Sequence, residues 1–250
     1  MKIAIVGYGR MGRLIADMAR ERGHEIVAVI DVDNRADFLS EAFREADVAI
    51  EFSVPAAGYD NIMECFRAGV PVVSGTTGFG NRLAELRELC ARGEGTLLHS
   101  TNFSIGVNVF RALNRYMARI MADFPAYRPF IRETHHIHKL DHPSGTAVTL
   151  AEELVESYPR AEGWYEPTVE RRPDGAWLPV SSVREGEVAG IHTIKWESDT
   201  DWIELTHSAK SRAGFAAGAV TAAEWLAGRK GFFTMGEMLS DITHTSNLFR

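Results

Sequence analysis

The chain of 250 residues is 45% hydrophobic and 24% charged, a globular composition large enough for one large domain or two smaller ones. Its net charge of −7 and the lack of any run of basic residues argue against nucleic acid or an anionic membrane as a partner. Cys65 and Cys90 have no metal-ligand spacing, and the first apolar run is far too short for a signal or membrane-spanning segment. We therefore expect a soluble protein of the cytoplasm.

The first twelve residues predict a strand followed by a phosphate-binding turn. Residues 2–6 are apolar and rich in β-branched side chains, and the next six, "GYGRMG", match the pattern G-x-G-x-x-G. A helix follows, because apolar residues then recur at helical spacing. Gly7 would allow the tight turn, Gly9 the close approach of a pyrophosphate, and Gly12 the close packing of the helix on the strand. This context favours a dinucleotide site over a purely structural glycine turn.

The second strand, "EIVAVI", ends at Asp31, where the dinucleotide fingerprint requires an acidic residue. A carboxylate at this position accepts hydrogen bonds from the adenosine ribose and favours NAD. Asn34 and Arg35 follow closely, however, and could accommodate the 2′-phosphate of NADP. We therefore expect NADH or NADPH as the cofactor, and the sequence leaves the choice open.

Strands and helices continue to alternate up to about residue 105. The apolar strands "VAIEF", "VPVVSG" and "TLLHS" are separated by a helix that opens at Pro55 and another at residues 81–92. Such alternation predicts an α/β fold with a Rossmann-like, doubly wound parallel sheet, whose ligand lies at the carboxyl ends of the strands. The turns at residues 75–78 and 100–104 follow strand ends, so they either line that crevice or are ordinary polar turns.

The second half of the chain changes character after an amphipathic helix at residues 107–121. Further strands are predicted at residues 127–136, 180–186, 189–198 and 201–209. With a helix only at residues 146–158, they indicate a smaller α+β domain with a mixed or antiparallel sheet. A last helix, at residues 214–228, is expected to pack back on the first domain. The expected divisions are a dinucleotide-binding domain (1–105), a domain for substrate binding and oligomerisation (106–212), and a C-terminal segment returning to the first domain (213–250).

The segment "HHIHKLDHPSGTA", residues 135–147, allows three interpretations. A closed zinc site is disfavoured, because a strand sends His135 and His136 to opposite faces and no zinc-ligand spacing is present, so we expect no metal. A solvated polar turn is the second interpretation, but it leaves the following helix start unexplained. We favour an acid-base site, in which imidazole and the ammonium group of Lys139 exchange protons and the helix start after Ser144 attracts a carboxylate. Beside a nicotinamide, this suits hydride transfer to a C=C or C=N bond.

Several motifs, spread along nearly the whole chain, resemble the motifs of one known protein family. They are "GRMG", "EFSVP", "GTTGF", "NFSIGVNV", "HHIHKLDHPSGTA", "VREGEVAGIHT" and "THSAKSRAGFAAGAV". In content and order they resemble the 4-hydroxy-tetrahydrodipicolinate reductase family, also called dihydrodipicolinate reductase, and the histidine segment is the most specific of them. The resemblance implies an NADH- or NADPH-dependent oxidoreductase of the diaminopimelate route to lysine. It would reduce a cyclic dicarboxylate imine to tetrahydrodipicolinate, in a two-domain subunit that usually forms a homotetramer through its sheet domain.

The resemblance also implies roles for individual residues. His135 would be the acid-base residue and Lys139 the proton donor, while His136 contacts the substrate and Gly145 and Thr146 hold a carboxylate. The implied cofactor contacts are Gly7, Tyr8, Gly9, Arg10, Met11, Gly12, Asp31, Gly75, Thr76, Thr77, Ser100, Thr101, Asn102 and Phe103. If both histidines are to reach one cleft, the strand must end or bend near His135.

Three features depart from the pattern of that family. The glycine turn is one residue shorter, His142 stands where alanine is usual, and Ile137 replaces a frequent arginine. The first bears on cofactor preference, and the other two bear on substrate affinity or pH optimum. Two other functions fit the same residues: another two-domain NAD(P) oxidoreductase of an anionic amino-acid intermediate, such as a homoserine or aspartate dehydrogenase, or a non-catalytic dinucleotide sensor. Cofactor binding without turnover of any imine or keto acid would favour the sensor.

Overall fold

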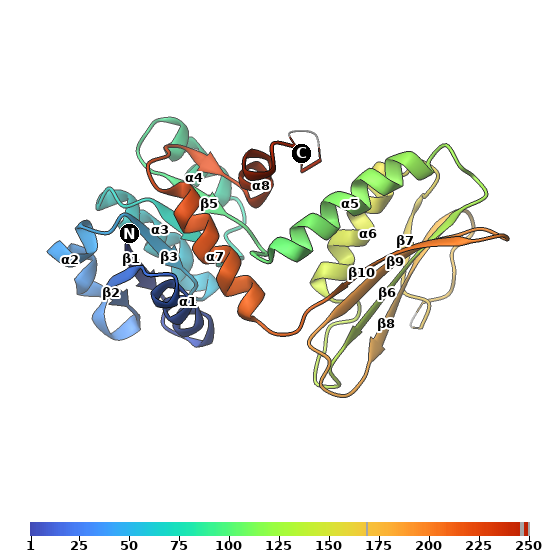
Figure 1. Ribbon diagram of the computed structural model, residues 1–250, viewed down its shortest axis with the longest axis horizontal. Coiled ribbons are helices and arrows are strands. Elements are labelled where there is room, and N and C mark those ends of the chain that lie inside the picture. The colour runs from blue at the N-terminus through green and yellow to red at the C-terminus, as the bar shows by residue number, and fades with distance from the viewer. Residues whose placement is uncertain (169, 246–247, 250) are drawn as a thin grey trace. The chain divides into compact units, whose positions relative to one another are not determined.

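A computed structural model of the chain describes residues 1–168, 170–245 and 248–249 (Figure 1). The chain divides into two compact units, one made of Met1–Ile105 together with Ala213–Arg250 and the other of Gly106–Arg212. We call them unit 1 and unit 2. Within the described ranges, no helix is long and apolar enough to cross a membrane.

Unit 1 is built on a six-stranded sheet in which all neighbouring strands are parallel. Its strands are β1 (Lys2–Val6), β2 (Glu25–Ile30), β3 (Val48–Glu51), β4 (Val72–Ser74), β5 (Leu97–His99) and β11 (Phe232–Phe233). Their order across the sheet is β11-β5-β4-β3-β1-β2. The direction of winding therefore reverses between β1 and β3, and sheets of this kind bind ligands at such a reversal, beyond the carboxyl ends of the strands.

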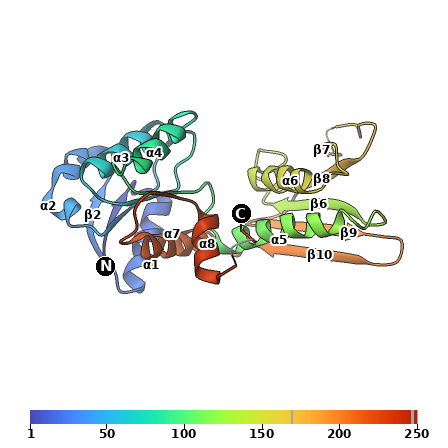
Figure 2. The same ribbon diagram turned by 90° about the horizontal axis from the view of Figure 1, so that it is seen from above.

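Helices cover both faces of this sheet (Figure 2). On one face lie α3 (Pro55–Arg67) and α4 (Arg82–Ala91), and on the other lie α1 (Arg10–Glu21) and α7 (Ala213–Leu226). The first face contributes a buried apolar core that joins β1, β3, β4 and β5 to α3 and α4. Because both faces are covered, the strands are apolar on both sides, which is why they read as continuous apolar runs in the sequence.

Helix α7 follows unit 2 in the sequence but belongs to unit 1, where it packs against α1. Its buried positions are small or apolar, and a Cβ added at Gly218 would lie 1.7 Å from the backbone oxygen of Phe103. Glycine at this position therefore lets the helix lie directly against the segment after β5. At the helix surface, Arg22 and His24 both contact the carboxylate of Glu224, at 3.1 and 2.8 Å.

Unit 2 contains a five-stranded mixed sheet with the order β10-β9-β6-β8-β7. Its strands are β6 (Arg128–His135), β7 (Gly163–Tyr165), β8 (Trp177–Arg184), β9 (Ile191–Glu197) and β10 (Trp202–Ser208). β6 is antiparallel to β9 and parallel to β8. The predicted fold class, a Rossmann-like parallel sheet with a second domain of mixed sheet, is confirmed.

One face of the unit 2 sheet packs against α5 (Ile105–Met121) and α6 (Gly145–Ser157) (Figure 1). Ile131 of β6, Val180 of β8 and Ile194 of β9 are fully buried in this core and lie opposite one another in the register of the sheet. Side chains alternate between the faces of a strand, so every second residue along these strands points toward the helices. The same alternation determines which polar side chains, farther along these strands, also point toward the helices.

Several short elements were not predicted from the sequence. They are the 3-10 helix η1 (Val32–Leu39), α2 (Glu41–Arg44), β7, β11 and α8 (Met235–Thr243). The 3-10 helix forms because Asp31 and Asn34 cap its start reciprocally, a local polar pattern without apolar periodicity. A similar signal was present for α8, whose capping box joins Thr234 and Glu237.

Candidate active site

The glycine turn after β1 has the geometry of a phosphate-binding turn. Gly7 has a φ of +87°, and a Cβ added there would lie 2.3 Å from the backbone oxygen of Phe52. A Cβ at Gly12 would lie 2.0 Å from the oxygen of Gly7, so the close packing of α1 on the turn requires glycine. At Gly9, where α1 begins, an added Cβ would meet nothing within 4 Å. Backbone N–H groups at the open start of a helix bind phosphate, so this turn fits a dinucleotide.

A pocket lies beside this turn, at the carboxyl ends of β1, β2 and β3. It is lined by Val6, Gly7, Tyr8, Gly9, Ile30, Asp31, Val32, Arg35, Phe52, Ser53, Val54, Ala57 and Asn61. The carboxylate of Asp31 accepts hydrogen bonds from the backbone N–H groups of Tyr8, at 3.2 Å, and of Val32, at 2.9 Å. The structure thus brings four of the predicted cofactor residues together: Gly7, Tyr8, Gly9 and Asp31. Arg10, Met11 and Gly12 belong to the adjoining first turn of α1 and are not among the lining residues.

The two other predicted cofactor segments follow β4 and β5, at the same edge of the sheet. Within Gly75 to Thr77, Thr76 is buried and accepts a hydrogen bond from the backbone N–H of Ser53 at 2.9 Å, while Thr77 is exposed. A Cβ at Gly75 would lie 2.3 Å from the ring of Phe52. In the second segment the side chains differ in exposure, and they belong to Ser100 (half-buried), Thr101 (exposed), Asn102 (half-buried) and Phe103 (buried). Neither segment lines the pocket beside Asp31.

In unit 2, β6 ends at His135, and the predicted strand end at this residue is confirmed. Glu133 lies two residues earlier, so both side chains occupy the sheet face that α5 and α6 cover. The imidazole Nδ1 of His135 makes a close contact with Oε2 of Glu133. His136 lies just past the strand, with its ring 5.9 Å from that of His138. That both imidazoles of the pair His135 and His136 reach one substrate stays a prediction.

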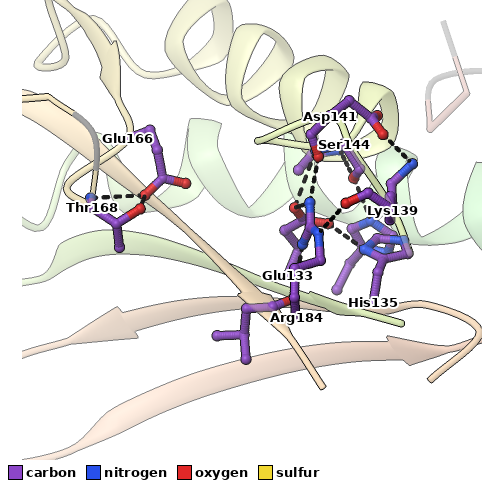
Figure 3. A network of polar contacts seen from close by, with 11 residues as sticks. Glu133, His135, Lys139, Asp141, Ser144, Glu166, Thr168 and Arg184 are labelled. Atoms are coloured by element: carbon purple, nitrogen blue, oxygen red, sulfur yellow. Dashed lines mark hydrogen bonds and ion pairs between the residues drawn. The ribbon is translucent and has the colours of Figure 1, made fainter. Parts of the chain in front are cut away.

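Glu133 is fully buried and is the centre of a polar network (Figure 3). Its Oε1 accepts hydrogen bonds from Nη2 of Arg184 at 3.0 Å and from the backbone N–H of Ser144 at 3.1 Å. Burial by itself would raise the pKa of Glu133, but the contacts from His135, Ser144 and Arg184 hold it well below the usual value. The carboxylate is therefore a fixed negative charge that orients the His135 ring.

His192, on β9, lies opposite Glu133 in the sheet and packs edge-on against His135, with 5.1 Å between ring centroids. Its Nε2 is 3.3 Å from Oγ of Ser144. Burial, reinforced by the interaction with the neighbouring imidazole of His135, lowers the pKa of His192 to about 4. At neutral pH His192 is therefore an uncharged side chain that lines the site. Gly190 leaves space beside Nε2 of His135, because a Cβ at Gly190 would lie 2.9 Å from that nitrogen.

Lys139 and the start of α6 complete the site. Nζ of Lys139 lies 2.8 Å from Oδ1 of Asp141, and this hydrogen bond lowers the pKa of Asp141, with a smaller contribution from the backbone N–H of Gly145. Ser144 caps the helix, and a Cβ at Gly145 would meet nothing within 4 Å. Thr146 is half-buried in the first turn of α6. The carboxylate of Asp141 thus contacts the start of α6, where the sequence predicts a carboxylate of the substrate.

Sequence reasoning missed Glu133, Arg184 and His192. Glu133 could have been found, because it lies two residues before His135 on the same strand and so shares its face. Arg184 and His192 come from β8 and β9, and no signal in one sequence gives the register that pairs them with β6. Glu133, His135 and His192 bring potential metal-ligating atoms within 4.8 Å of one another. However, Arg184 already compensates the charge of Glu133, which favours proton chemistry over cation binding at this cluster.

A parallel sheet with a turn suited to phosphate, together with a second unit that carries an imidazole, an ammonium group and a helix start suited to an anion, is typical of nicotinamide-dependent oxidoreductases. Solved structures share this fold. An amine dehydrogenase from Mycobacterium smegmatis superposes with a TM-score of 0.56 at 11% identity, over 93% of this chain and 94% of its own. At that identity the likeness shows the fold alone.

Closer relatives define the particular family. The family "Dihydrodipicolinate reductase, N-terminus" matches residues 1–103, and "Dihydrodipicolinate reductase, C-terminus" matches residues 106–239. A 4-hydroxy-tetrahydrodipicolinate reductase of Christiangramia forsetii is 46% identical over 97% of this chain and 99% of its own, and one of Archaeoglobus fulgidus is 36% identical over 96% and 100%. The dipicolinate-bound dihydrodipicolinate reductase of Paenisporosarcina sp. TG-14 superposes with a TM-score of 0.74 at 25% identity, over 94% and 97%. The chain belongs to the dihydrodipicolinate reductase family.

Family membership confirms the resemblance seen in the sequence motifs. The chain is an oxidoreductase that uses a nicotinamide cofactor, and its reaction is the reduction step of this family in diaminopimelate and lysine biosynthesis.

Proposed function

We propose that the chain reduces the dihydrodipicolinate imine, formed from 4-hydroxy-tetrahydrodipicolinate, to tetrahydrodipicolinate, with His135 and Lys139 as its acid-base residues. The observation that carries this assignment is the network around Glu133. It holds the imidazole of His135 at the end of β6, in the same segment as the ammonium group of Lys139 and the start of α6. These are the groups that an anionic imine needs for binding and protonation.

The chemistry divides between the cofactor and the chain. Bound nicotinamide supplies a hydride, so the substrate must also gain one proton for each bond reduced. Lys139 donates this proton, and His135, whose Nδ1 faces the Glu133 carboxylate, supplies acid-base function through its other ring nitrogen, Nε2. Gly145 and Thr146 bind a substrate carboxylate at the N-terminus of α6, where it replaces Asp141 as the partner of the helix start. His136 contacts the substrate from beyond the strand end.

The cofactor assignment follows from unit 1. NADH and NADPH both fit, since Asp31 can accept hydrogen bonds from a free ribose and Arg35 lines the same pocket. The turn from Gly7 to Gly12 holds the pyrophosphate, and the segments 75–77 and 100–103 supply the remaining contacts. We assign dinucleotide binding to residues 1–105 with 213–250, and substrate binding to residues 106–212. The sheet of unit 2 also forms a homotetramer, in the cytoplasm.

Oxidation of NADH and NADPH by freshly generated 4-hydroxy-tetrahydrodipicolinate, followed by absorbance, tests the reaction. We expect rapid oxidation by the native chain, and a fall in kcat of about 10²–10⁴-fold in His135→Asn and in Lys139→Met, the contribution typical of a general acid or base. His138→Gln is the control, because His138 belongs to the same segment, has no assigned role in the reaction, is exposed and contacts the exposed Glu187, while its ring lies 5.9 Å from that of His136. Full activity in both site variants would remove the catalytic assignment. Cofactor binding without turnover would remove the reaction itself.

A further inference from the structure

A second buried carboxylate, Glu51, lies at the end of β3 and takes no part in the chemistry described so far. It is fully buried, and Ser74 and Thr76 donate hydrogen bonds to it at 2.6 and 2.9 Å. Ser53 makes a further short contact, and Nδ2 of Asn61 donates to Oε1 at 3.4 Å. In the described part of the chain, no lysine, arginine or histidine forms an ion pair with Glu51. Its partners are neutral donors, at the edge of the sheet where the dinucleotide turn lies.

Glu51 determines which way the amide of Asn61 points. A carboxylate only accepts hydrogen bonds, so the NH₂ group of the amide must face it. The same NH₂ group donates to Oγ of Ser53 at 3.1 Å. The amide oxygen is thereby directed away from Glu51, and it accepts a hydrogen bond from Nη1 of Arg35 at 2.6 Å. If the amide rotated by half a turn, two donor groups would face each other and Arg35 would lose this partner.

Arg35 is the cation of the dinucleotide pocket. It is exposed and lines the pocket together with Asp31 and the glycine turn, and its guanidinium lies 5.6 Å from the ring centroid of Phe38. A free arginine side chain pays a large entropic cost to hold one geometry, and a hydrogen bond at one nitrogen reduces that cost while leaving its other N–H groups available. A planar guanidinium fixed beside the ribose-binding carboxylate suits a phosphate group.

We propose that Glu51 is a positioning residue that, through Asn61, fixes Arg35 for recognition of the 2′-phosphate of NADPH. The inference rests on the proposed dinucleotide role of the pocket and adds to it the residues that set cofactor choice. NADH has no 2′-phosphate and engages Asp31 instead, so its binding does not depend on this relay. Glu51 therefore raises the affinity for NADPH without touching either cofactor.

The test measures dissociation constants for NADPH and NADH by titration calorimetry, with no imine present. In Glu51→Gln, which keeps the shape but permits the amide of Asn61 to turn, the dissociation constant for NADPH should rise about tenfold, the scale of one charge-assisted contact. The constant for NADH should stay within about twofold. Ser74→Ala is the matched control, because it removes a donor from the other oxygen of Glu51 and leaves Asn61 in place. Its ratio of NADPH to NADH affinity should be native.

A double-mutant cycle separates positioning from general damage. Arg35→Gln should lose NADPH affinity as well, and adding Glu51→Gln to it should cause no further loss. Asn61→Ala provides a second route to the same result if Glu51→Gln fails to fold. Equal losses for both cofactors, or additive losses in the double variant, would overturn the proposal. A native chain that binds NADPH through this relay but turns over no imine would instead overturn the proposed reaction, and a native chain that binds neither cofactor would overturn both.

Discussion

Glu133 and Arg184 form a buried ion pair on which the geometry of His135 depends. The side chains of both residues are almost fully buried, and Arg184 also contacts the backbone oxygens of Lys139 and Asp141. One guanidinium thus ties the end of β6 to the loop that carries Lys139. Because a buried charge without its partner is costly, the two residues should behave as one unit in mutagenesis.

Glu133→Gln keeps the volume of the side chain and removes its charge. We expect the free energy of unfolding to fall by about 3 kcal/mol, because Arg184 is left buried without its counter-charge. The pH profile of kcat should also change, since His135 loses the carboxylate beside Nδ1. Chemical denaturation and the pH profile of NADPH oxidation measure the two effects. An unchanged pH profile with reduced stability would assign Glu133 a purely structural role.

His192 makes stability depend on pH in a definite direction. Its pKa is about 4 in the folded chain against 6.5 when unfolded, so between these values the unfolded chain binds more protons. Stability is therefore full above about pH 6.5 and falls as the pH drops toward 4, by up to about 3 kcal/mol. Glu133, with its depressed pKa, adds a loss only below its usual value of 4.5. Besides burial, the neighbouring His135, His207 and Lys139 lower the pKa of His192, and Glu133 raises it.

Urea denaturation at several pH values measures this dependence. In His192→Gln the fall between about pH 6.5 and 4 should be smaller, because the buried titrating group is gone. His138→Gln should retain the full fall, since His138 is exposed. If both variants show the native slope, His192 is not the group responsible.

At the scale of elements, the strand, turn and first helix of unit 1 show two different uses of glycine. Gly12 lies where α1 packs against the turn, whereas Gly9 faces open space at the start of the helix. The first position is restricted by the protein itself, and we propose that the second is restricted by the bound pyrophosphate. The sequence has glycine at both positions and does not distinguish the two uses.

The two glycines should therefore respond differently to alanine. Gly12→Ala places a methyl group 2.0 Å from the oxygen of Gly7 and should lower the melting temperature by several degrees, along with cofactor affinity. Gly9→Ala meets no protein atom, so it should leave the melting temperature unchanged and weaken cofactor binding by about tenfold through contact with the pyrophosphate. Thermal melts with and without NADPH distinguish the two. Native cofactor affinity in Gly9→Ala would contradict the assigned position of the pyrophosphate.

The longer elements of unit 1 could be predicted because each of them depends on a local pattern. The apolar runs of β1 to β5, the glycine turn and the acidic residue at the end of β2 all lie close together in sequence. The histidine segment and the start of α6 were predictable for the same reason. The relay from Glu51 to Arg35 and the contacts of Arg184 and His192 were not, because they join residues from separate strands and helices. Short elements capped by polar side chains, such as η1, were missed because they carry no apolar period.

At the scale of the whole molecule, β10 gives unit 2 an exposed sheet edge. Within the described residues β10 pairs only with β9, and Trp202 and Ile203 on it are 63% and 40% exposed. Apolar side chains on a free edge strand favour association with another copy. This surface is therefore where we expect the proposed homotetramer to form.

Light scattering of the native chain should give four times the subunit mass of 27.7 kDa. The double substitution Trp202→Glu and Ile203→Glu should give a smaller species, because two charges replace the apolar edge. Leu39→Glu is the control, since Leu39 is also an exposed apolar residue, at 69%, and lies in unit 1. A native mass of one subunit, or a tetramer unaffected by the double substitution, would exclude this surface.

Unit 1 consists of two separate stretches of the chain, so the ribosome synthesises its parts at different times. Strand β5 pairs with β4 on one side and with β11 on the other, and β11 follows it by roughly 130 residues, about 7 to 27 seconds of translation. During that time α7 is also missing, so one face of the nascent parallel sheet lacks a helix that covers it. Unit 2 is contiguous and leaves the ribosome whole in the interval. The unit whose strands are synthesised first is thus the last to be completed, and the edge of β5 has no partner strand until β11 has been made.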